Sequence, residues 1–416
     1  MLSYDARMVS EPSPADRRPF ELGPFRGLRF DPATVGDLGT VISPPYDVLD
    51  AETVRDLEAA NRRNIVRLIL SRRFERPYRA VRERLHKWRD KGYLRPDKDP
   101  ALYLYEYTVD DVAVRGLIGV VALRDESERV ILPHEHVMPG PVDDRTVLMS
   151  TTETNLEPIL LVHEGTARLH DLIARVAENR PAADFTALDG SRHRLWTLTE
   201  PSTLEAVAHQ LAPTQVLIAD GHHRYAAYLR LQRELREPDA PPGSSPWDFG
   251  LAMLVDQRDH ALHVGPIHRS LAALTMSDVQ ELAADRGDTF RTMPDREAAF
   301  AAQSADDPAR AAFVVSDGRA WALLQTPRTS PVDAAVLHDV LLPAWEIADE
   351  QIGYHHSLDQ ALQTTARQPG VVVAVRPPTV PEVMAAAAAG QRMPRKSTSF
   401  APKPRMGVVM RDLNDR

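Results

Sequence analysis

A short stretch near the middle of the chain combines the residue types that phosphate chemistry uses. It reads Asp-Gly-His-His-Arg over residues 220–224, and it follows the apolar run 216–219. We predict a buried strand in that run, a turn at Asp220-Gly221 and a helix from Tyr225 to about Arg236. A helix that opens on a glycine turn directs backbone N–H groups and the positive end of its dipole at its neighbour. The pattern therefore favours binding of an anion, and of phosphate first.

Each residue type in this stretch has a physical role beside a phosphate. Gly221 lacks a Cβ and lets the backbone approach closely, and Arg224 can form bidentate bonds to phosphate oxygens. Asp220 would be repelled unless it binds Mg²⁺ or takes a proton from an attacking hydroxyl, which favours phosphoryl transfer over simple anion binding. The alternative is a hydrogen-bonded structural turn. The predicted nucleotide-binding or acid–base residues here are Asp220, Gly221, His222, His223, Arg224 and Tyr225.

A second group of ionisable residues follows the apolar run 130–132. Pro133-His134-Glu135-His136 leads into a Pro/Gly-punctuated segment that carries Asp143, Asp144 and Arg145, and we predict a loop there. The two histidines lie two residues apart, which is not the His-Glu-x-x-His zinc pattern, so metal binding is weakly signalled and no metal ligand is assigned. Glu135 is a candidate catalytic carboxylate. The alternative is an internal salt-bridged network of His134, Glu135 and Arg145.

Three further segments supply candidate site residues. Tyr46 and Asp47 follow two prolines that fix an extended backbone, although a Pro-stiffened loop would look the same. A Pro-bounded segment near the C-terminus offers cations and hydroxyls for a phosphate or a carboxylate, against the alternative of a solvated basic tail. The predicted substrate-binding residues are Tyr46, Asp47, His134, Arg145, His268 and Arg269, and the additional phosphate-binding residues are Lys396, Ser397, Thr398 and Lys403.

Composition limits the classes of function. The 416 residues are enough for two or three domains, and the formal net charge of −9 argues against broad nucleic-acid binding. The chain has no cysteine, which excludes disulfides, thiolate metal sites and cysteine nucleophiles. The first 18 residues do not resemble a signal peptide, and no apolar run is long enough to span a membrane. We expect a cytoplasmic protein that acts on small molecules.

The elements that must position these residues alternate between short strands and helices, which predicts a mixed α+β fold. We expect a disordered leader at 1–19, an N-terminal lobe at 20–100, a central domain at 101–270 with the phosphate-binding loop, and a C-terminal α+β domain at 271–416 whose Lys-Ser-Thr segment returns to the site. The predicted helices are 51–61, 78–91, 167–180, 203–211, 277–286, 331–347 and 381–390. The predicted strands are 102–108, 115–123, 157–163, 192–198, 371–375 and 406–410, with hairpins over 249–265 and 312–324.

Several of these stretches together resemble one bacterial family, domain-of-unknown-function family 1015, whose activity is not established. The segments that carry the resemblance occur in the family's order along nearly the whole chain. They are Pro44-Pro45-Tyr46-Asp47-Val48, Pro133-His134-Glu135, Ala219 to Tyr225, His268-Arg269, and Met393-Pro394 through Lys396-Ser397-Thr398 to Pro402-Lys403. The chain departs from the pattern at Arg395 and Ala401, where an uncharged residue and an aromatic residue are more usual.

A shorter resemblance covers only the strand–Asp-Gly-His-His-Arg–helix segment. It is similar to the nucleotide-binding loop of the superfamily of partition proteins, sulfiredoxins and free-serine kinases, which implies a nucleotide-binding core with additional α+β lobes. In those kinases a glutamate on an earlier loop orients or deprotonates the acceptor hydroxyl, a role that Glu135 would take here.

This resemblance implies a nucleotide-dependent phosphotransferase that acts on a small hydroxylated metabolite, with free serine as the first candidate. It would use Mg²⁺ with a nucleoside di- or triphosphate, with Asp220, Glu135 and His223 as catalytic residues. A CTP- or ATP-binding regulatory module and a phosphohydrolase of a small phosphoester are the alternatives. Neither a membrane nor a nucleic acid is expected as a partner, and a homo-oligomer is compatible with the sequence.

Overall fold

The structure is a computed structural model, and it describes residues 18–70, 77–237, 239–260, 262–305 and 307–415. The chain forms two compact units. Unit 1 comprises Met1–Leu132, Pro139–Ala261 and Pro404–Arg416, and unit 2 comprises Pro133–Met138 and Leu262–Lys403. Almost all of the expected leader lies outside the described residues. The division into four segments stays a prediction.

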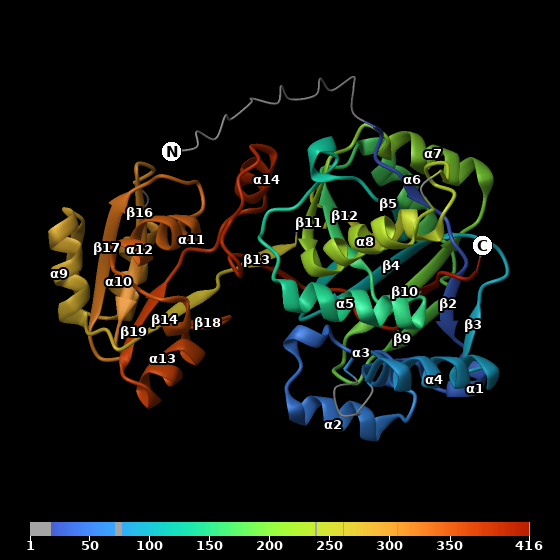
Figure 1. The fold of residues 1–416 in the computed structure, drawn as a ribbon, viewed down its shortest axis with the longest axis horizontal. Coiled ribbons are helices and arrows are strands. Elements are labelled where there is room, and N and C mark those ends of the chain that lie inside the picture. The colour runs from blue at the N-terminus through green and yellow to red at the C-terminus, as the bar shows by residue number, and fades with distance from the viewer. Residues whose placement is uncertain (1–17, 71–76, 238, 261, 306, 416) are drawn as a thin grey trace. The chain divides into compact units, whose positions relative to one another are not determined.

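Unit 1 is built on a nine-stranded mixed sheet with the order β6-β11-β8-β12-β5-β4-β10-β9, and β1 pairs with β5 (Figure 1). The strands are β1 (Leu22–Gly23), β4 (Leu102–Val109), β5 (Val112–Ala122), β6 (Ile131–Leu132), β8 (Ile159–His163), β9 (Ala183–Thr186), β10 (Arg192–Leu198), β11 (Val216–Asp220) and β12 (Phe249–Asp256). Strands β8 and β12 are buried along nearly their whole length, as their continuous apolar sequences require. Strand β11, which pairs with β8, is therefore held in a well-packed sheet, and this fixes the position of the residues at its end.

Helices cover this sheet, and α5 (Pro139–Thr152) packs against α8 (His222–Leu235). Both helices run across the same face of the sheet in Figure 1. Tyr225, Ala227, Tyr228 and Leu231 of α8 are buried in the core cluster that includes the sheet. The other helices of this part are α6 (Ala167–Ala177) and α7 (Pro201–Leu211), with the 3₁₀ turns η4 (Glu126–Glu128) and η5 (Pro246–Asp248).

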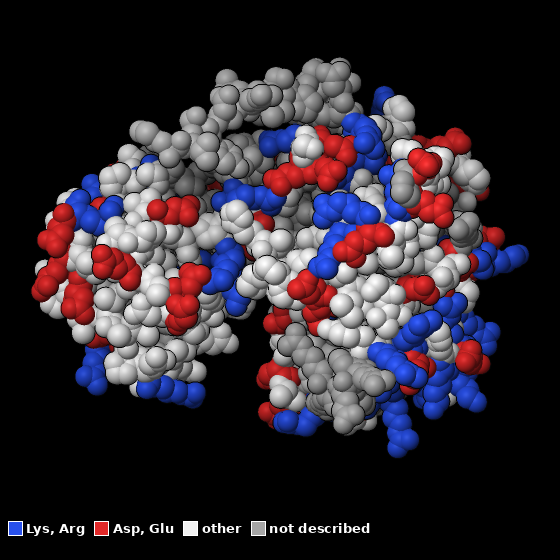
Figure 2. Space-filling view, in the orientation of Figure 1, with Lys and Arg blue, Asp and Glu red and all other residues white. Residues whose placement is uncertain are grey.

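A second sheet of unit 1, with the order β3-β2-β21-β7, carries the N-terminal helices. Its strands are β2 (Gly27–Phe30), β3 (Leu94–Pro96), β7 (Thr154–Asn155) and β21 (Met410–Asp412). The helical elements here are α1 (Pro32–Val35), η2 (Leu38–Thr40), η3 (Tyr46–Val48), α2 (Ala51–Ala60), α3 (Val66–Ile69) and α4 (Pro77–Asp90). Lys and Arg side chains gather around the position of α4 on the face in Figure 2. This helix carries the exposed Arg79, Arg82 and Lys87. A local basic surface thus exists on a chain of net negative charge.

Unit 2 has a six-stranded sheet with the order β15-β17-β16-β19-β14-β18 and a two-stranded sheet, β13-β20. The strands are β13 (His263–Gly265), β14 (His268–Ala272), β15 (Thr289–Met293), β16 (Arg310–Ser316), β17 (Trp321–Pro327), β18 (Ile352–His355), β19 (Gly370–Ala374) and β20 (Ser399–Ala401). The helical elements are α9 (Met276–Arg286), α10 (Arg296–Ser304), α11 (Asp333–Val336), the π-helix η6 (Leu337–Leu341), α12 (Leu342–Ala344), η7 (Asp349–Gln351), α13 (Leu358–Arg367) and α14 (Val380–Ala388).

The mixed α+β fold class is confirmed, but four local predictions are wrong. Residues 139–152 form helix α5 instead of a loop, because the prolines occupy its first turn, where a missing N–H is tolerated. The predicted hairpin over 249–265 does not form, since β12 pairs with β5 and β8 and β13 pairs with β20. Helix α8 starts at His222, three residues earlier than expected. The last strand, β21, begins at Met410 instead of Met406.

Candidate functional site

The junction of β11 and α8 is a sharp turn that depends on Gly221. Its φ is +94°, and a Cβ at this position would lie 2.9 Å from Ile159 Cγ2. The strand has a register irregularity between Ile218 and Asp220, and such bulges redirect side chains near functional sites. Gly221 is the N-cap of α8, and no side chain caps this end of the helix. The predicted arrangement of strand, glycine turn and helix is therefore present, and the dipole of a 14-residue helix starts at this turn.

Arg224 lies in the first turn of α8 and binds protein oxygen atoms. Its Nη2 donates to Asp220 Oδ2 at 2.6 Å, and its Nη1 donates to the carbonyl of Pro158. The residue is 6% exposed. Burial acts to lower the pKa of Arg224, but the carboxylates of Glu157 and Asp220 outweigh burial and raise it. Arg224 thus stays charged and fixes the orientation of the Asp220 carboxylate.

Glu157 lies between two guanidinium groups. Its Oε2 is 3.7 Å from Arg224 Nη1, and its Oε1 is 3.6 Å from Arg145 Nη1. Burial raises the pKa of Glu157, and the two arginines partly offset this effect. Arg224 Nε and Arg145 Nη1 are buried and have no hydrogen-bond partner among the residues that the structure describes. The cluster therefore holds donors that its own acceptors do not satisfy.

Arg145 of this cluster also contacts Tyr46, which follows Pro44 and Pro45. The guanidinium carbon of Arg145 is 5.0 Å from the ring centroid of Tyr46, a cation–π contact. Burial, followed by the charge of Glu157, raises the pKa of Tyr46. Arg145 Nε also donates to Asp144 Oδ2 at 2.9 Å, and Tyr78 donates to Asp144 Oδ1 at 2.6 Å. Unit 1 thus brings together Tyr46, Arg145, Asp220 and Arg224, four of the residues that the sequence analysis named as candidates.

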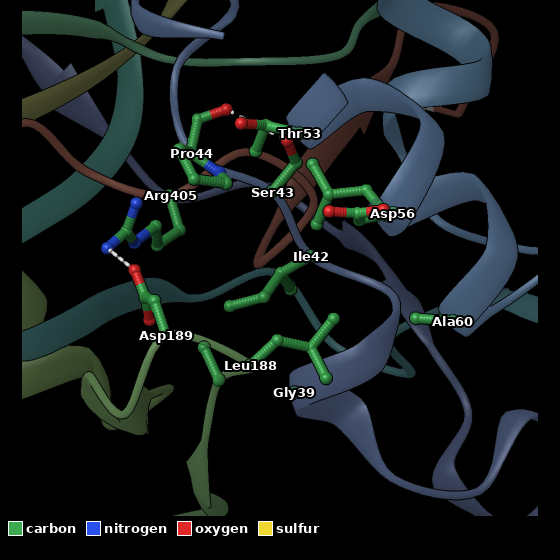
Figure 3. Close-up of a pocket in the computed structure, with 12 residues that line it drawn as sticks. Gly39, Ile42, Ser43, Pro44, Thr53, Asp56, Ala60, Leu188, Asp189 and Arg405 are labelled. Atoms are coloured by element: carbon green, nitrogen blue, oxygen red, sulfur yellow. Dashed lines mark hydrogen bonds and ion pairs between the residues drawn. The ribbon is translucent and has the colours of Figure 1, made fainter. Parts of the chain in front are cut away.

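A cavity of about 320 Å³ adjoins this segment (Figure 3). Its walls are mainly apolar, and Arg405 and Asp189 form an ion pair at one side. Ser43 and Pro44 come from the segment before Tyr46. The complete lining is Gly39, Ile42, Ser43, Pro44, Thr53, Asp56, Leu57, Ala60, Ala187, Leu188, Asp189 and Arg405. A volume of this order suits a small metabolite.

A buried hydrogen-bonded chain fixes the loop on one side of this cavity. Ser191 Oγ donates to Asp189 Oδ1 at 2.5 Å and lies 2.8 Å from His193 Nε2, and His193 Nδ1 is 2.8 Å from the Tyr105 hydroxyl. Burial lowers the pKa of His193 to about 4, so the ring is neutral and both its nitrogens take part in the chain. Asp189 is therefore held in one orientation.

Glu135 of unit 2 holds the predicted Lys-Ser-Thr segment. Its Oε1 accepts hydrogen bonds from the backbone N–H of Ser397 at 3.0 Å, from the backbone N–H of Thr398 at 3.1 Å and from the Thr398 hydroxyl at 3.0 Å. His134 is fully buried, with Nε2 at 2.8 Å from Thr398 Oγ1. Burial raises the pKa of Glu135, against the effect of these hydrogen bonds. In this unit Glu135 acts as the anchor of a turn.

The turn held by Glu135 places cations on one aromatic ring. Lys396 has a φ of +55°, a left-handed conformation that a non-glycine residue rarely adopts, and its Nζ lies 5.1 Å from the centroid of Tyr354. The guanidinium carbon of Arg269 lies 4.8 Å from the same ring. Arg269 is fully buried, with Nη2 donating to the carbonyl of Lys396 and Nε donating to His338 Nε2. The strained backbone of Lys396 is thus hydrogen-bonded directly to the buried guanidinium group of Arg269.

His268 and Arg269, which the sequence placed in one site, serve different environments. Both lie on β14, where successive side chains point to opposite faces of the sheet. Arg269 contacts Tyr354 and His338, whereas His268 lines a separate cavity between α10 and the end of β19. The two residues therefore do not share a ligand-binding surface within unit 2.

The predicted site residues divide between the two units. Those in unit 1 are Tyr46, Asp47, Arg145, Asp220, Gly221, His222, His223, Arg224 and Tyr225. Those in unit 2 are His134, Glu135, His268, Arg269, Lys396, Ser397, Thr398 and Lys403. Tyr225 is buried and its hydroxyl bonds the backbone of Arg124, and the Ser397 hydroxyl bonds the carbonyl of Pro394.

Sequence reasoning missed Glu157 and Tyr354 as members of these clusters, and it named Asp144 without assigning it a role. Glu157 carried a weak signal, because it is a carboxylate two residues before the apolar run 159–162. Among the described residues, no group of three His, Asp or Glu side chains is arranged to hold a metal ion. No helix in the described part of the chain is long and apolar enough to cross a membrane.

Comparison with known proteins places the chain in a family. Residues 22–349 match the family described as protein of unknown function, DUF1015, and no curated protein matches. Similar solved structures include a free serine kinase in complex with AMP, at 16% identity and a TM-score of 0.37, with 68% of this chain and 88% of that chain covered. A conserved hypothetical protein from Pyrococcus furiosus has 17% identity and a TM-score of 0.37, with 69% and 93% covered. SbnI with a C-terminal truncation, from Staphylococcus aureus, has 11% identity and a TM-score of 0.38, with 69% and 84% covered. This chain belongs to the DUF1015 family of proteins of unknown function.

Proposed function

We propose that unit 1 binds the phosphates of a nucleotide at the start of α8 and transfers a phosphoryl group to a small hydroxylated metabolite. The observation that carries this proposal is the glycine-capped start of α8 beside the buried cluster of Asp220, Arg224, Glu157 and Arg145. A helix start without a side-chain cap binds anions well. The unsatisfied donors of Arg145 and Arg224 add positive charge close to it.

The arrangement assigns different roles to the two charged residues of the loop. Asp220 is the catalytic carboxylate, and it accepts the proton of the attacking hydroxyl as the new P–O bond forms and the nucleotide oxygen leaves with the bonding electrons. Arg224 is a positioning residue, because Asp220 and Pro158 already accept its hydrogen bonds. A phosphate would instead meet the backbone N–H groups of the first turn.

Mg²⁺ fits this chemistry without a preformed metal cage. In nucleotide sites Mg²⁺ takes one or two carboxylates and completes its coordination with phosphate oxygens and water. Asp220 adjoins the helix start and would meet the ion through a coordinated water, which leaves its carboxylate able to accept the proton of the acceptor hydroxyl. The ion would neutralise phosphate charge, while the chain orients the nucleotide and the acceptor.

Calorimetric binding of ATP, ADP and CTP, with and without Mg²⁺, tests the phosphate site. We expect Gly221→Ala to abolish binding, because the new Cβ meets Ile159 and φ at this position is positive. Ala219→Gly, which also alters one small side chain of β11 but adds no atoms, is the control. If no nucleotide binds, the proposal fails.

Turnover is then tested with ATP or ADP, Mg²⁺ and free serine as the first acceptor, by mass spectrometry of phosphoserine. Asp220→Asn keeps an oxygen for Arg224, so we expect nucleotide binding to persist and turnover to fall by about 10²-fold or more, the usual contribution of a general base. Asp143→Asn, at an exposed position on α5, is the matched control. Release of phosphate without a phosphorylated product would indicate a phosphohydrolase, and binding without turnover of any acceptor would indicate a regulatory module.

A further inference from the structure

A second cavity lies wholly within unit 2 and has no part in the proposed phosphate site. Its volume is about 760 Å³, within the range of small-molecule sites. It lies beside α10, the start of α13 and the segment after β19. Its lining residues are Pro266, His268, Arg296, Glu297, Phe300, Ala301, Gln303, Ser304, Leu358, Val375, Arg376 and Pro377. We call it the His268 cavity.

His268 presents one defined donor to this cavity. The residue is 6% exposed, and its Nδ1 accepts a hydrogen bond from the backbone N–H of Val375 at 3.3 Å. A neutral ring that accepts at Nδ1 carries its proton on Nε2. Nε2 has no hydrogen-bond partner among the residues that the structure describes. Because His268 lines the cavity, this N–H is available to an acceptor of a ligand or to water.

Two arginines contribute positive charge near His268. Burial first, and then the charges of Arg269, His355 and Arg296, lower its pKa to about 4. A positive potential that disfavours a second proton on the ring favours an anion at the same place. The ring therefore stays a neutral donor at pH 7, within a field that attracts negative charge.

Arg296 can turn to a ligand at little cost. Its Nη1 is 3.0 Å from Asp359 Oδ1, but the two side chains are 53% and 71% exposed. An exposed pair of this kind contributes about 0–1 kcal/mol, so a ligand carboxylate can replace Asp359. Arg376, also on the wall, pairs with Glu382 and Asp333.

We propose that the His268 cavity binds a small organic monocarboxylate with an apolar body. The carboxylate accepts hydrogen bonds from His268 Nε2 and Arg296, and the body packs against Phe300 and Leu358. Glu297 on the wall repels a second negative charge, which selects a monoanion over a phosphate dianion. None of its lining residues belongs to unit 1.

The test uses the full-length protein and fluorine NMR. The probes are para-fluorobenzoate, para-fluorophenylacetate and 6-fluorohexanoate, with para-fluorobenzyl alcohol as the neutral counterpart and inorganic phosphate as a competitor. We expect at least one carboxylate to bind saturably, the alcohol to bind at least about tenfold more weakly, and phosphate not to displace the carboxylate. A tenfold ratio corresponds to about 1.4 kcal/mol.

Variants locate the site. Ala301 is exposed and lines the cavity, so Ala301→Trp should abolish binding without disturbing the core. Ala305→Trp, one turn further along, should leave binding unchanged. Arg296→Gln should weaken binding by about tenfold, as expected for a lost charged hydrogen bond, and Arg291→Gln on the exposed face of β15 should leave it unchanged. His268→Gln should also weaken binding, with exposed His263→Gln as its control.

Three results would overturn the proposal. They are no saturable binding of any carboxylate, equal binding of the alcohol, and carboxylate binding that survives Ala301→Trp. Displacement by inorganic phosphate would assign the cavity to phosphoesters instead. Because none of these assays contains a nucleotide, their failure leaves the proposal for unit 1 untouched.

Discussion

Arg224 in unit 1 and Glu135 in unit 2 are both buried charges that hold a loop in place, but they are neutralised differently. Arg224 meets two full opposite charges, Asp220 at 2.6 Å and Glu157 at 3.7 Å. Glu135 meets backbone N–H groups and a hydroxyl from the 397–398 turn. If Arg224 is removed, its two carboxylate partners keep their negative charges. If Glu135 is removed, its partners are left as uncharged donors without this acceptor. The loop of unit 1 therefore depends on charge balance, and that of unit 2 on hydrogen-bond geometry.

The largest effect is expected from Arg224→Ala. It leaves the buried Glu157 with Arg145 as its arginine partner and removes the Arg224 hydrogen bonds to Asp220 and to the Pro158 carbonyl. Breaking a buried pair in this way costs about 3–5 kcal/mol of the free energy of unfolding. Urea denaturation of the full chain measures it. Arg230→Ala on the same helix breaks only exposed pairs and should cost about 0–1 kcal/mol. Equal effects of the two variants would refute the charge-balance account.

Glu135→Ala should cost less, about 2 kcal/mol, because it unpairs neutral donors of one turn. Hydrogen exchange should rise at the amides of Ser397 and Thr398 while peptides of α8 keep their protection. Glu135→Gln retains an acceptor oxygen and should restore most of the protection. Exposed Glu281→Ala on α9 is the control. Loss of protection throughout unit 2 in the glutamine variant would show that the charge, and not the acceptor, matters.

The free energy of unfolding of unit 2 should also depend on pH through His338, whose Nε2 accepts a hydrogen bond from Arg269 Nε. Burial lowers the pKa of His338 to about 3, below the ordinary value of 6.5, so the unfolded chain binds the proton first as pH falls. Stability from this residue is present above pH 6.5 and is lost between pH 6.5 and 3. His338→Gln keeps an acceptor for Arg269 and should reduce the stability loss between pH 7 and 5 by about 2 kcal/mol. His263→Gln, at an exposed site, should leave that loss unchanged, and a His338→Gln profile that parallels the wild type would contradict the assignment.

The smallest effect is expected at Lys396. Its left-handed backbone strains any residue with a Cβ, so Lys396→Gly should be more stable than Lys396→Ala by about 0.5–1 kcal/mol. Both variants remove the ammonium near Tyr354, so their difference isolates backbone strain. Thermal unfolding of the pair gives the value. A more stable alanine variant would mean that the turn relaxes once the lysine is gone.

The sequence located the glycine turn after β11 because periodicity changes there from strand to helix and because glycine tolerates a positive φ. It also located α2, whose N-cap Asp50 accepts from the backbone N–H of Thr53. These are local signals that fifteen residues can carry.

Long-range pairing was beyond the sequence. No local pattern could show that β13 pairs with β20, that Glu157 lies between Arg145 and Arg224, or that β14 sends His268 and Arg269 to different surroundings. Arg224 matched a phosphate ligand by type, and only burial and its bonds to Asp220 and Pro158 favour a positioning role. Residue type indicates what a side chain can bind, whereas packing decides which partner it meets.

The interleaving of the two units also constrains the order in which the chain can fold during synthesis. Strand β21 lies between β2 and β7 in the second sheet of unit 1, although some 380 residues separate β2 from β21 along the chain. A ribosome therefore finishes every residue of unit 2 before it releases the strand that completes unit 1. Such distant pairing is slow and leaves strand edges open meanwhile. Until β21 emerges, β2 and β7 would each expose an edge that a chaperone could protect.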